Sequence, residues 1–172
     1  MKKILLVLLL LPGVLPILAN TPPRLVINLV VSSMRPDDID RYRSQFGTGG
    51  FLRLTEGGAR FTEGSYDYQQ TSTPVSLATL TTGAMPSPHG VIGSRWVDYT
   101  TNRIVGLTAG RQGPGAYNLI APTLSEPLLR HAPGSRSVTV AAEAVSAVVM
   151  AGRAGEVFWL DSARCDWVTS PY

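Results

Sequence analysis

The side chains that could do chemistry in this sequence gather near its middle. Three hydroxyl residues, Thr71, Ser72 and Thr73, run up to Pro74 and the apolar stretch that follows. Thr is favoured at a helix N-cap and Pro at the first helical position. Judged from the residues alone, Thr73 is therefore the N-cap of a helix over 75–82, which Gly83 ends.

Histidine and cysteine are scarce. The sequence has two histidines, His89 and His131, and one cysteine, Cys165. His89 lies in the loop that follows the 75–82 helix, with no Asp, Glu or second His at ligand spacing, so it is a weak metal signal. One cysteine cannot close a disulfide within the chain. We expect Cys165 to be either a buried turn residue or a thiol that pairs with another molecule, and the turn residue is the simpler expectation.

Helix and strand signals alternate around these residues, which predicts an α/β fold with a mostly parallel sheet. Residues 25–31 are β-branched and almost continuously apolar, which is typical of a strand buried on both faces. Pro36 and the acids after it open a helix. The further expected helices are 51–56 and 123–131, and the further expected strands are 59–66, 95–98 and 103–105 as a hairpin, 137–142, and 157–160.

Composition excludes several classes of protein. The 172 residues are 44% hydrophobic and 16% charged, which is too apolar for a disordered chain. The net charge of +3 includes Lys2 and Lys3, and the rest of the sequence has 13 basic against 12 acidic residues and no lysine. A net charge of +1 does not favour a nucleic-acid partner.

The amino terminus has the layout of a secretory signal peptide over residues 1–19. Two lysines precede an unbroken apolar run over 4–11, and a small residue, Ala19, stands at a plausible cleavage point before Asn20. The apolar stretch is shorter than a bilayer span and contains two prolines, which argues against a stable membrane anchor. We therefore expect residues 20–172 to work in the periplasm or outside the cell.

The stretch from Thr73 to Trp96 resembles the nucleophile segment of the alkaline phosphatase superfamily, in its type I phosphodiesterase and phosphate-irrepressible alkaline phosphatase branch. In that branch a threonine opens a helix, Thr-Gly closes it, and a Pro-x-x-His-Gly-[IV]-x-Gly loop follows. The matching residues here are Thr82-Gly83, Pro86, His89-Gly90-Val91 and Gly93. Residues 30–35 resemble the end of the family's first strand. The resemblance implies a three-layer α/β fold, of which residues 20–172 would form the amino-terminal part.

The resemblance also implies a chemistry. A threonine or serine oxygen attacks phosphorus, and two zinc ions activate that oxygen and steady the leaving group. Thr73 holds the nucleophile position, next to a helix amino terminus that suits a phosphoryl group. His89 corresponds to a structural residue, which implies that it fixes its loop by hydrogen bonding.

Several positions depart from the family pattern. Ser32 stands where the family has its first metal-binding aspartate, and a neutral hydroxyl is a poor zinc ligand. Ser94 stands where the family has a phosphate-binding asparagine. Glu143 and Val145 replace a Lys-x-Arg pair of the monoesterases, and Leu77 replaces a histidine. Asp37 and Asp38 are better explained as acids of a first helical turn than as substitute ligands.

The later ligands of the family, an Asp-x-x-x-His, an Asp-His pair and a further histidine, have no counterparts in this sequence. We therefore expect no zinc in this chain and no activity from it alone. One alternative is an active phosphomonoesterase or phosphodiesterase in which Thr73 works with ligands from a second chain or a downstream segment. Another is a truncated or decaying reading frame. The sequence identifies no partner.

Overall fold

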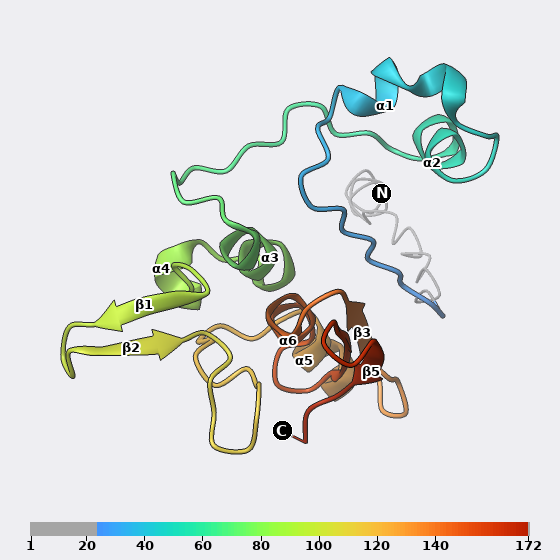
Figure 1. The fold of residues 1–172 in the computed structure, drawn as a ribbon. Helices are drawn as coiled ribbons and strands as arrows, with labels where there is room; N and C mark the ends of the chain where they lie inside the picture. Colours follow the sequence, from blue (N-terminus) through green and yellow to red (C-terminus); the bar gives the residue numbers. More distant parts are fainter. Residues whose placement is uncertain (1–23, 172) are drawn as a thin grey trace, which may run out of the picture. The chain divides into compact units, whose positions relative to one another are not determined.

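The computed structural model describes residues 24–171, drawn in Figure 1. Contacts divide the chain into two units, residues 1–34 and 35–172. The expected signal peptide over residues 1–19 lies outside the described residues. No helix among residues 24–171 is long and apolar enough to cross a membrane.

The expected first strand does not form. Residues 25–31 have no strand assignment, and their apolar side chains are exposed, with Leu25 at 74% and Ile27 at 76%. A strand needs a hydrogen-bonded neighbour, and no strand within residues 24–171 pairs with this segment. The segment therefore has the composition of a buried strand but forms no strand, because no strand within residues 24–171 pairs with it.

Short helices follow. The helix opened by Pro36 is broken into α1 (Asp38–Arg41) and the 3₁₀ turn η1 (Arg43–Gln45), and α2 (Phe51–Gly57) forms as expected. The expected strand over 59–66 is wrong, because those residues pair with no other strand. Arg60 instead donates two hydrogen bonds to the Asp40 carboxylate at 2.8 and 2.9 Å, which holds the pKa of Asp40 below its usual value.

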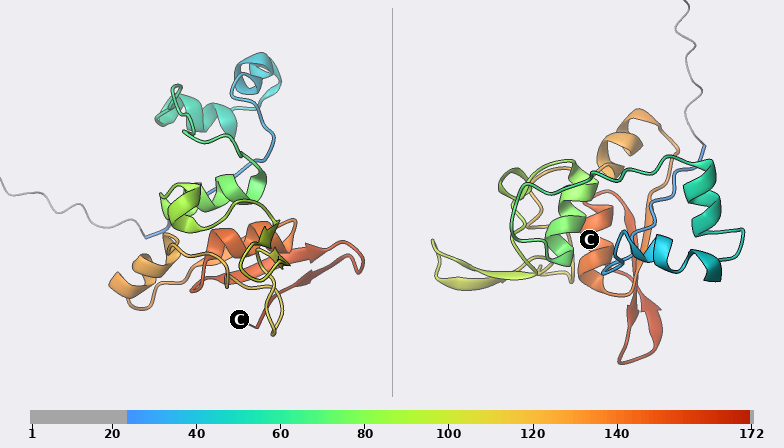
Figure 2. Two further views of the ribbon diagram at one scale, coloured as in Figure 1. Left: turned by 90° about the vertical axis from the view of Figure 1, so that its left-hand side faces the viewer. Right: turned by 90° about the horizontal axis from the view of Figure 1, so that it is seen from above.

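The core of the second unit is layered. Helix α3 (Thr73–Thr82) packs on α6 (Ala144–Ala151), and α6 packs on a three-stranded sheet of β3 (Val138–Ala141), β4 (Glu156–Asp161) and β5 (Asp166–Val168). Figure 2 shows α6 between α3 and the strands. Strands β3 and β4 are parallel, with Val140 opposite Phe158, and β5 is antiparallel to β4.

Helix α6 and strand β5 are elements that the sequence patterns missed. The α6 residues are almost all Ala and Val, and both sides of the helix are covered: Ala147 and Ala151 contact the sheet, while Val148 and Val149 join the core under α3. A helix that is apolar all round carries little periodic signal. Strand β5 has only three residues and is recognisable mainly by its pairing with β4.

One of the remaining elements, α4 (Pro86–His89), contacts α3. It follows α3 in the chain, and after it come the hairpin of β1 (Arg95–Asp98) and β2 (Arg103–Gly106), and later α5 (Ser125–His131). The hairpin and both flanks of its turn were expected from the sequence. Cys165 is an exposed residue of the turn between β4 and β5, so the expectation of a buried turn residue is wrong.

Candidate active site

The hydroxyl of the proposed nucleophile lies at the start of α3. Thr73 is the first residue of the helix and Pro74 the second, so the N-cap is Ser72, one residue earlier than the sequence indicated. Ser72 has extended backbone angles, φ −62° and ψ 154°, because a residue before a helix leaves the helical region. The first turn is closed by the Ser76 N–H, which donates to the Ser72 carbonyl at 3.0 Å.

Capping at this terminus is incomplete. The Ser72 side chain makes no capping hydrogen bond, and its Oγ is buried without a partner. The first N–H groups of a helix have no intrahelical acceptors, and Pro74 has no N–H at all. The terminus therefore keeps part of its positive end charge beside the Thr73 hydroxyl, an arrangement that favours an anion.

A buried imidazole fixes the chain on either side of α3. His89 is fully buried, and its Nδ1 accepts the Val91 N–H at 3.0 Å. Because Nδ1 is the acceptor, the proton is assigned to Nε2, which donates to Thr79 Oγ1 at 3.1 Å. The Tyr68 hydroxyl donates to the same Thr79 oxygen at 2.9 Å. This cluster, Tyr68–Thr79–His89, ties the segment before α3 to the loop after it.

Burial keeps the imidazole neutral. The pKa of His89 is lowered, mainly because a charged imidazolium would lose its hydration in this site. A neutral His89 can accept from Val91 and donate to Thr79 at once, whereas an imidazolium would turn two donors toward each other at Nδ1. The expectation that His89 fixes its loop through hydrogen bonds is confirmed.

Gly90 allows the loop to close on the core. It has a left-handed backbone, φ 75°, and a Cβ placed on it would lie 2.6 Å from Cδ1 of Ile120. The Ile120 N–H donates to the His89 carbonyl at 3.0 Å, which brings that side chain against the glycine. The His-Gly pair therefore combines an internal hydrogen-bonding group with a left-handed backbone position at which a Cβ would displace the Ile120 side chain.

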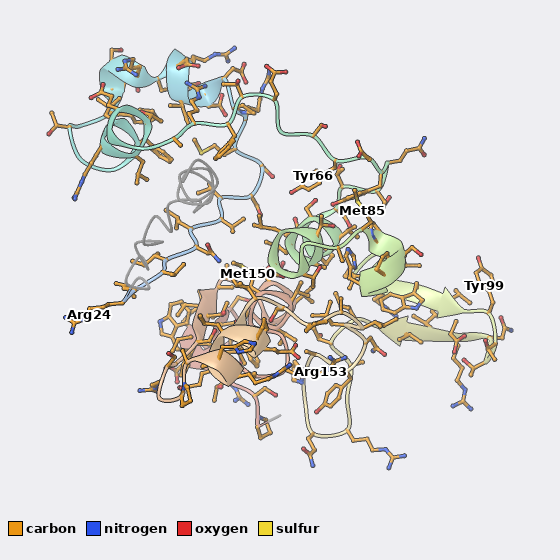
Figure 3. The ribbon with its side chains drawn as sticks, turned by 180° about the vertical axis from the view of Figure 1, so that it is seen from behind. Arg24, Tyr66, Met85, Tyr99, Met150 and Arg153 are labelled. Carbon is orange, nitrogen blue, oxygen red and sulfur yellow. The ribbon has the colours of Figure 1, made fainter. Side chains whose placement is uncertain are left out.

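The other candidate positions are spread over the chain. Ser94 is exposed just before β1, and its carbonyl accepts the Leu107 N–H at 2.9 Å. Ser32 is exposed and belongs to the first unit, so it is not placed relative to Thr73. Figure 3 shows Tyr99 at the tip of the hairpin that Ser94 introduces, pointing away from the core. Among residues 35–171, no hydrogen bond joins Thr73 to Ser94.

The residues at which the resemblance implies a departure from the family pattern have structural roles here. Glu143 is the N-cap of α6 and accepts a hydrogen bond from the Ser146 hydroxyl at 2.9 Å, while Val145 packs against the core. Leu77 is a buried core residue. Asp37 is the N-cap of α1 and Asp38 its first residue, and a hydrogen bond from Arg35 lowers the pKa of Asp37. The two acids are therefore first-turn residues, as the sequence indicated.

The sequence model of the type I phosphodiesterase / nucleotide pyrophosphatase family matches residues 26–172. The chain belongs to this family. It is similar to alkaline phosphatase PafA of Elizabethkingia meningoseptica, with 32% identity over 87% of the chain, and to alkaline phosphatase PhoK of Sphingomonas sp., with 31% identity over 83%. It spans 30% and 28% of the lengths of these two relatives.

A solved member of the family has the same fold. The crystal structure of wild-type PafA superposes on 88% of this chain with a TM-score of 0.81 at 28% sequence identity, and the chain covers 32% of it. The expectation of an alkaline-phosphatase-like α/β fold, in its amino-terminal part, is thereby confirmed. A second PafA structure, of a mutant, gives a TM-score of 0.76.

The zinc ions that the family resemblance implies do not fit the donors present. Residues 24–171 contain no group of three or more His, Cys, Asp or Glu side chains placed to hold a metal ion. The side chain at the start of α3 is the hydroxyl of Thr73, and the resemblance places the hydroxyl of Ser32 at the first metal-ligand position; neutral hydroxyls bind zinc poorly compared with imidazole, thiolate or carboxylate. His89 has both ring nitrogens occupied by Val91 and Thr79, so it has no lone pair free for a metal.

Proposed function

We propose that this chain is an exported member of the type I phosphodiesterase / nucleotide pyrophosphatase family that has no phosphoesterase activity on its own. One observation carries the proposal: Thr73, to which the family resemblance gives the nucleophile position, begins helix α3, while the described residues offer no group of metal-binding side chains. A threonine hydroxyl keeps its proton at neutral pH and is a poor nucleophile without an activating group. The scaffold would then serve in binding or structure.

Export is part of this proposal. Its support is the pattern of Lys2 and Lys3 before an unbroken apolar run. We place the mature chain, starting near Asn20, in the periplasm or outside the cell.

Hydrolysis of a chromogenic phosphate monoester and a diester, with added zinc, tests the proposal directly. The chain, Ser32→Asp and Thr73→Ala should give equal background rates, because Ser32→Asp returns one ligand out of several and a two-metal site needs both ions. Turnover by the unaltered chain above the Thr73→Ala background would refute the proposal. The Thr73→Ala variant is a matched control because it removes only the candidate nucleophile.

A second candidate function is an active phosphomonoesterase or phosphodiesterase completed by additional polypeptide. It is favoured by Thr73 at the start of α3 and by the hydrogen-bonded His89 loop after that helix, in a chain that spans about 30% of the length of a relative. Turnover in Ser32→Asp alone would indicate that a second chain supplies the other ligands. A coding sequence that continues past Tyr172 with Asp-x-x-x-His and Asp-His would favour a downstream segment, whereas a stop would favour an inactive or decaying frame.

A further inference from the structure

The two hydrogen bonds of the buried His89 ring respond differently to a second proton. Nδ1 accepts the Val91 N–H, and Nε2 donates to the Thr79 hydroxyl oxygen. A proton on Nδ1 removes the acceptor for Val91 and turns two donors toward each other. The bond to Thr79 is kept, because Nε2 carries a proton in both charge states. Protonation therefore breaks the bond to the loop after α4 and leaves the bond to α3.

The elements packed against His89 offer no carboxylate to an imidazolium. Helices α3 and α4 contain no Asp, Glu, Lys or Arg. The segment around Leu119, which packs on the loop, brings the half-exposed Tyr117 and the guanidinium of Arg153, which donates to the Leu119 carbonyl and lies 4.0 Å from the Glu126 carboxylate. The only acid on this side is thus already beside a cation, so a proton on His89 stays uncompensated.

The loop that this bond holds is short and is anchored at its other end. It runs from Gly90 to Gly93, and its Val91 side chain is fully buried in the core. Beyond it, the Ser94 carbonyl accepts the Leu107 N–H at 2.9 Å, which ties the next residue to the end of the hairpin. Glycine at both ends of the loop allows the backbone angles to change there at little cost. The loop can therefore open between two fixed points while α3, α6 and the sheet stay folded.

We propose that His89 is a pH-sensitive latch, whose protonation in mildly acidic surroundings opens the loop over residues 90–93 while its contact with α3 is kept. The loop leads directly to Ser94, where the family resemblance implies a phosphate-binding position. The latch therefore determines the pH range in which that position is held firmly on the core. It depends on the hydrogen bonds of His89 alone and operates whether or not the chain hydrolyses a phosphate ester.

Amide hydrogen exchange of the full chain, followed by NMR from pH 7.5 to 5.0 and corrected for intrinsic rates, tests the latch without using activity. The Val91 N–H is the direct reporter, because it is the group that Nδ1 accepts. Its opening constant should rise up to about thirtyfold over this range, since the open loop titrates near the ordinary pKa of 6.5 and the closed loop below it. The buried Val148 N–H of α6 reports global unfolding and should stay better protected at every pH. Low urea should speed exchange at Val148 and leave Val91 unchanged, because local opening exposes little surface.

Two variants assign the effect to one ring. His89→Gln puts a neutral amide in place of the imidazole, so exchange at Val91 should lose its pH dependence. His131→Gln changes an exposed histidine and should keep that dependence, which makes it the matched control.

Three results would overturn the proposal. Equal protection of Val91 and Val148, with the same dependence on urea, would show that only global unfolding exposes the loop. An opening constant at Val91 that is the same at pH 7.5 and 5.0 would show that no proton is linked to the loop. The same acceleration in His89→Gln would assign the proton to another group. The first two results come from the unaltered chain, so they decide the matter even if His89→Gln does not fold. Hydrolysis by the chain would refute its proposed inactivity and leave the latch standing, so the two failures are distinguishable.

Discussion

The neutral state of His89 predicts a loss of stability in mildly acidic solution. Its pKa is lowered in the folded chain by burial, whereas the unfolded chain has the ordinary value of about 6.5. As the pH falls below 6.5 the unfolded chain takes up a proton first. The stabilisation is therefore fully present above pH 6.5 and is lost as the pH falls toward the folded-state pKa.

The size of the effect follows from the linkage relation. One proton bound only by the unfolded state changes the free energy of unfolding by about 1.4 kcal/mol per pH unit. Between pH 6.5 and 5.0 the loss is therefore at most about 2 kcal/mol, which is a large part of the 5–15 kcal/mol typical of a domain. The carboxylates with lowered pKa values, Asp37, Asp40 and Asp98, titrate below this range and do not contribute to it.

Urea unfolding followed by tryptophan fluorescence at pH 7.5, 6.5, 5.5 and 5.0 measures this loss. His89→Gln should lower stability at pH 7.5 by about 2–3 kcal/mol, because two hydrogen bonds are disturbed in a buried site, but should remove the pH dependence. His131→Gln is the matched control, since His131 is exposed and should leave the slope as it is. A slope that persists in His89→Gln, or disappears in His131→Gln, would refute the assignment of the proton-linked step to the buried imidazole.

Further outcomes follow from the same structure. Gly90→Ala should destabilise the chain by about 1–3 kcal/mol in urea unfolding, because its Cβ would meet Ile120 at a left-handed backbone position, while Gly49→Ala, with open space around it, should change stability by less than about 0.5 kcal/mol. Elemental analysis of the purified chain should find well under one zinc per molecule, and a stoichiometric zinc would contradict the poor donor set around Ser32. Amino-terminal sequencing of the exported protein should begin near Asn20, and an intact Met1 in the membrane fraction would mean an anchor.

Capping and turn residues in the sequence predicted the elements whose ends depend on neighbouring residues, which are α3 and the β1–β2 hairpin. The start of α3 follows from a hydroxyl residue and Pro74, and its end from Gly83, which has φ 66°. The β1–β2 hairpin follows from the Thr101-Asn102 turn, where Asn102 has φ 50°. These features depend on residues within one turn or one hairpin, so the sequence contains all that is needed to recognise them.

Features that depend on distant parts of the chain could not be predicted in the same way. Residues 25–31 have the composition of a buried strand, but pairing decides whether a strand forms. The cluster Tyr68–Thr79–His89 could not be predicted from spacing alone, because Thr79 joins Tyr68 to His89 from three separate segments of the chain. The unpartnered Ser72 hydroxyl depends on how the chain enters α3, which no propensity describes.

The two-sided packing of α6 has a consequence for the position of the candidate nucleophile. A single helix separates α3 from the sheet, so the height of Thr73 above the strands is set by the thickness of α6, with about 8–10 Å between the axes of the two helices. Small residues, Ala147 and Ala151, face the strands, and Val148 and Val149 face α3. A larger side chain at Ala147 or Ala151 would move α6 away from the sheet. Helix α3 would move with it, because α3 packs on α6. The volume of the side chains on α6 therefore determines the distance between the sheet and the Thr73 hydroxyl.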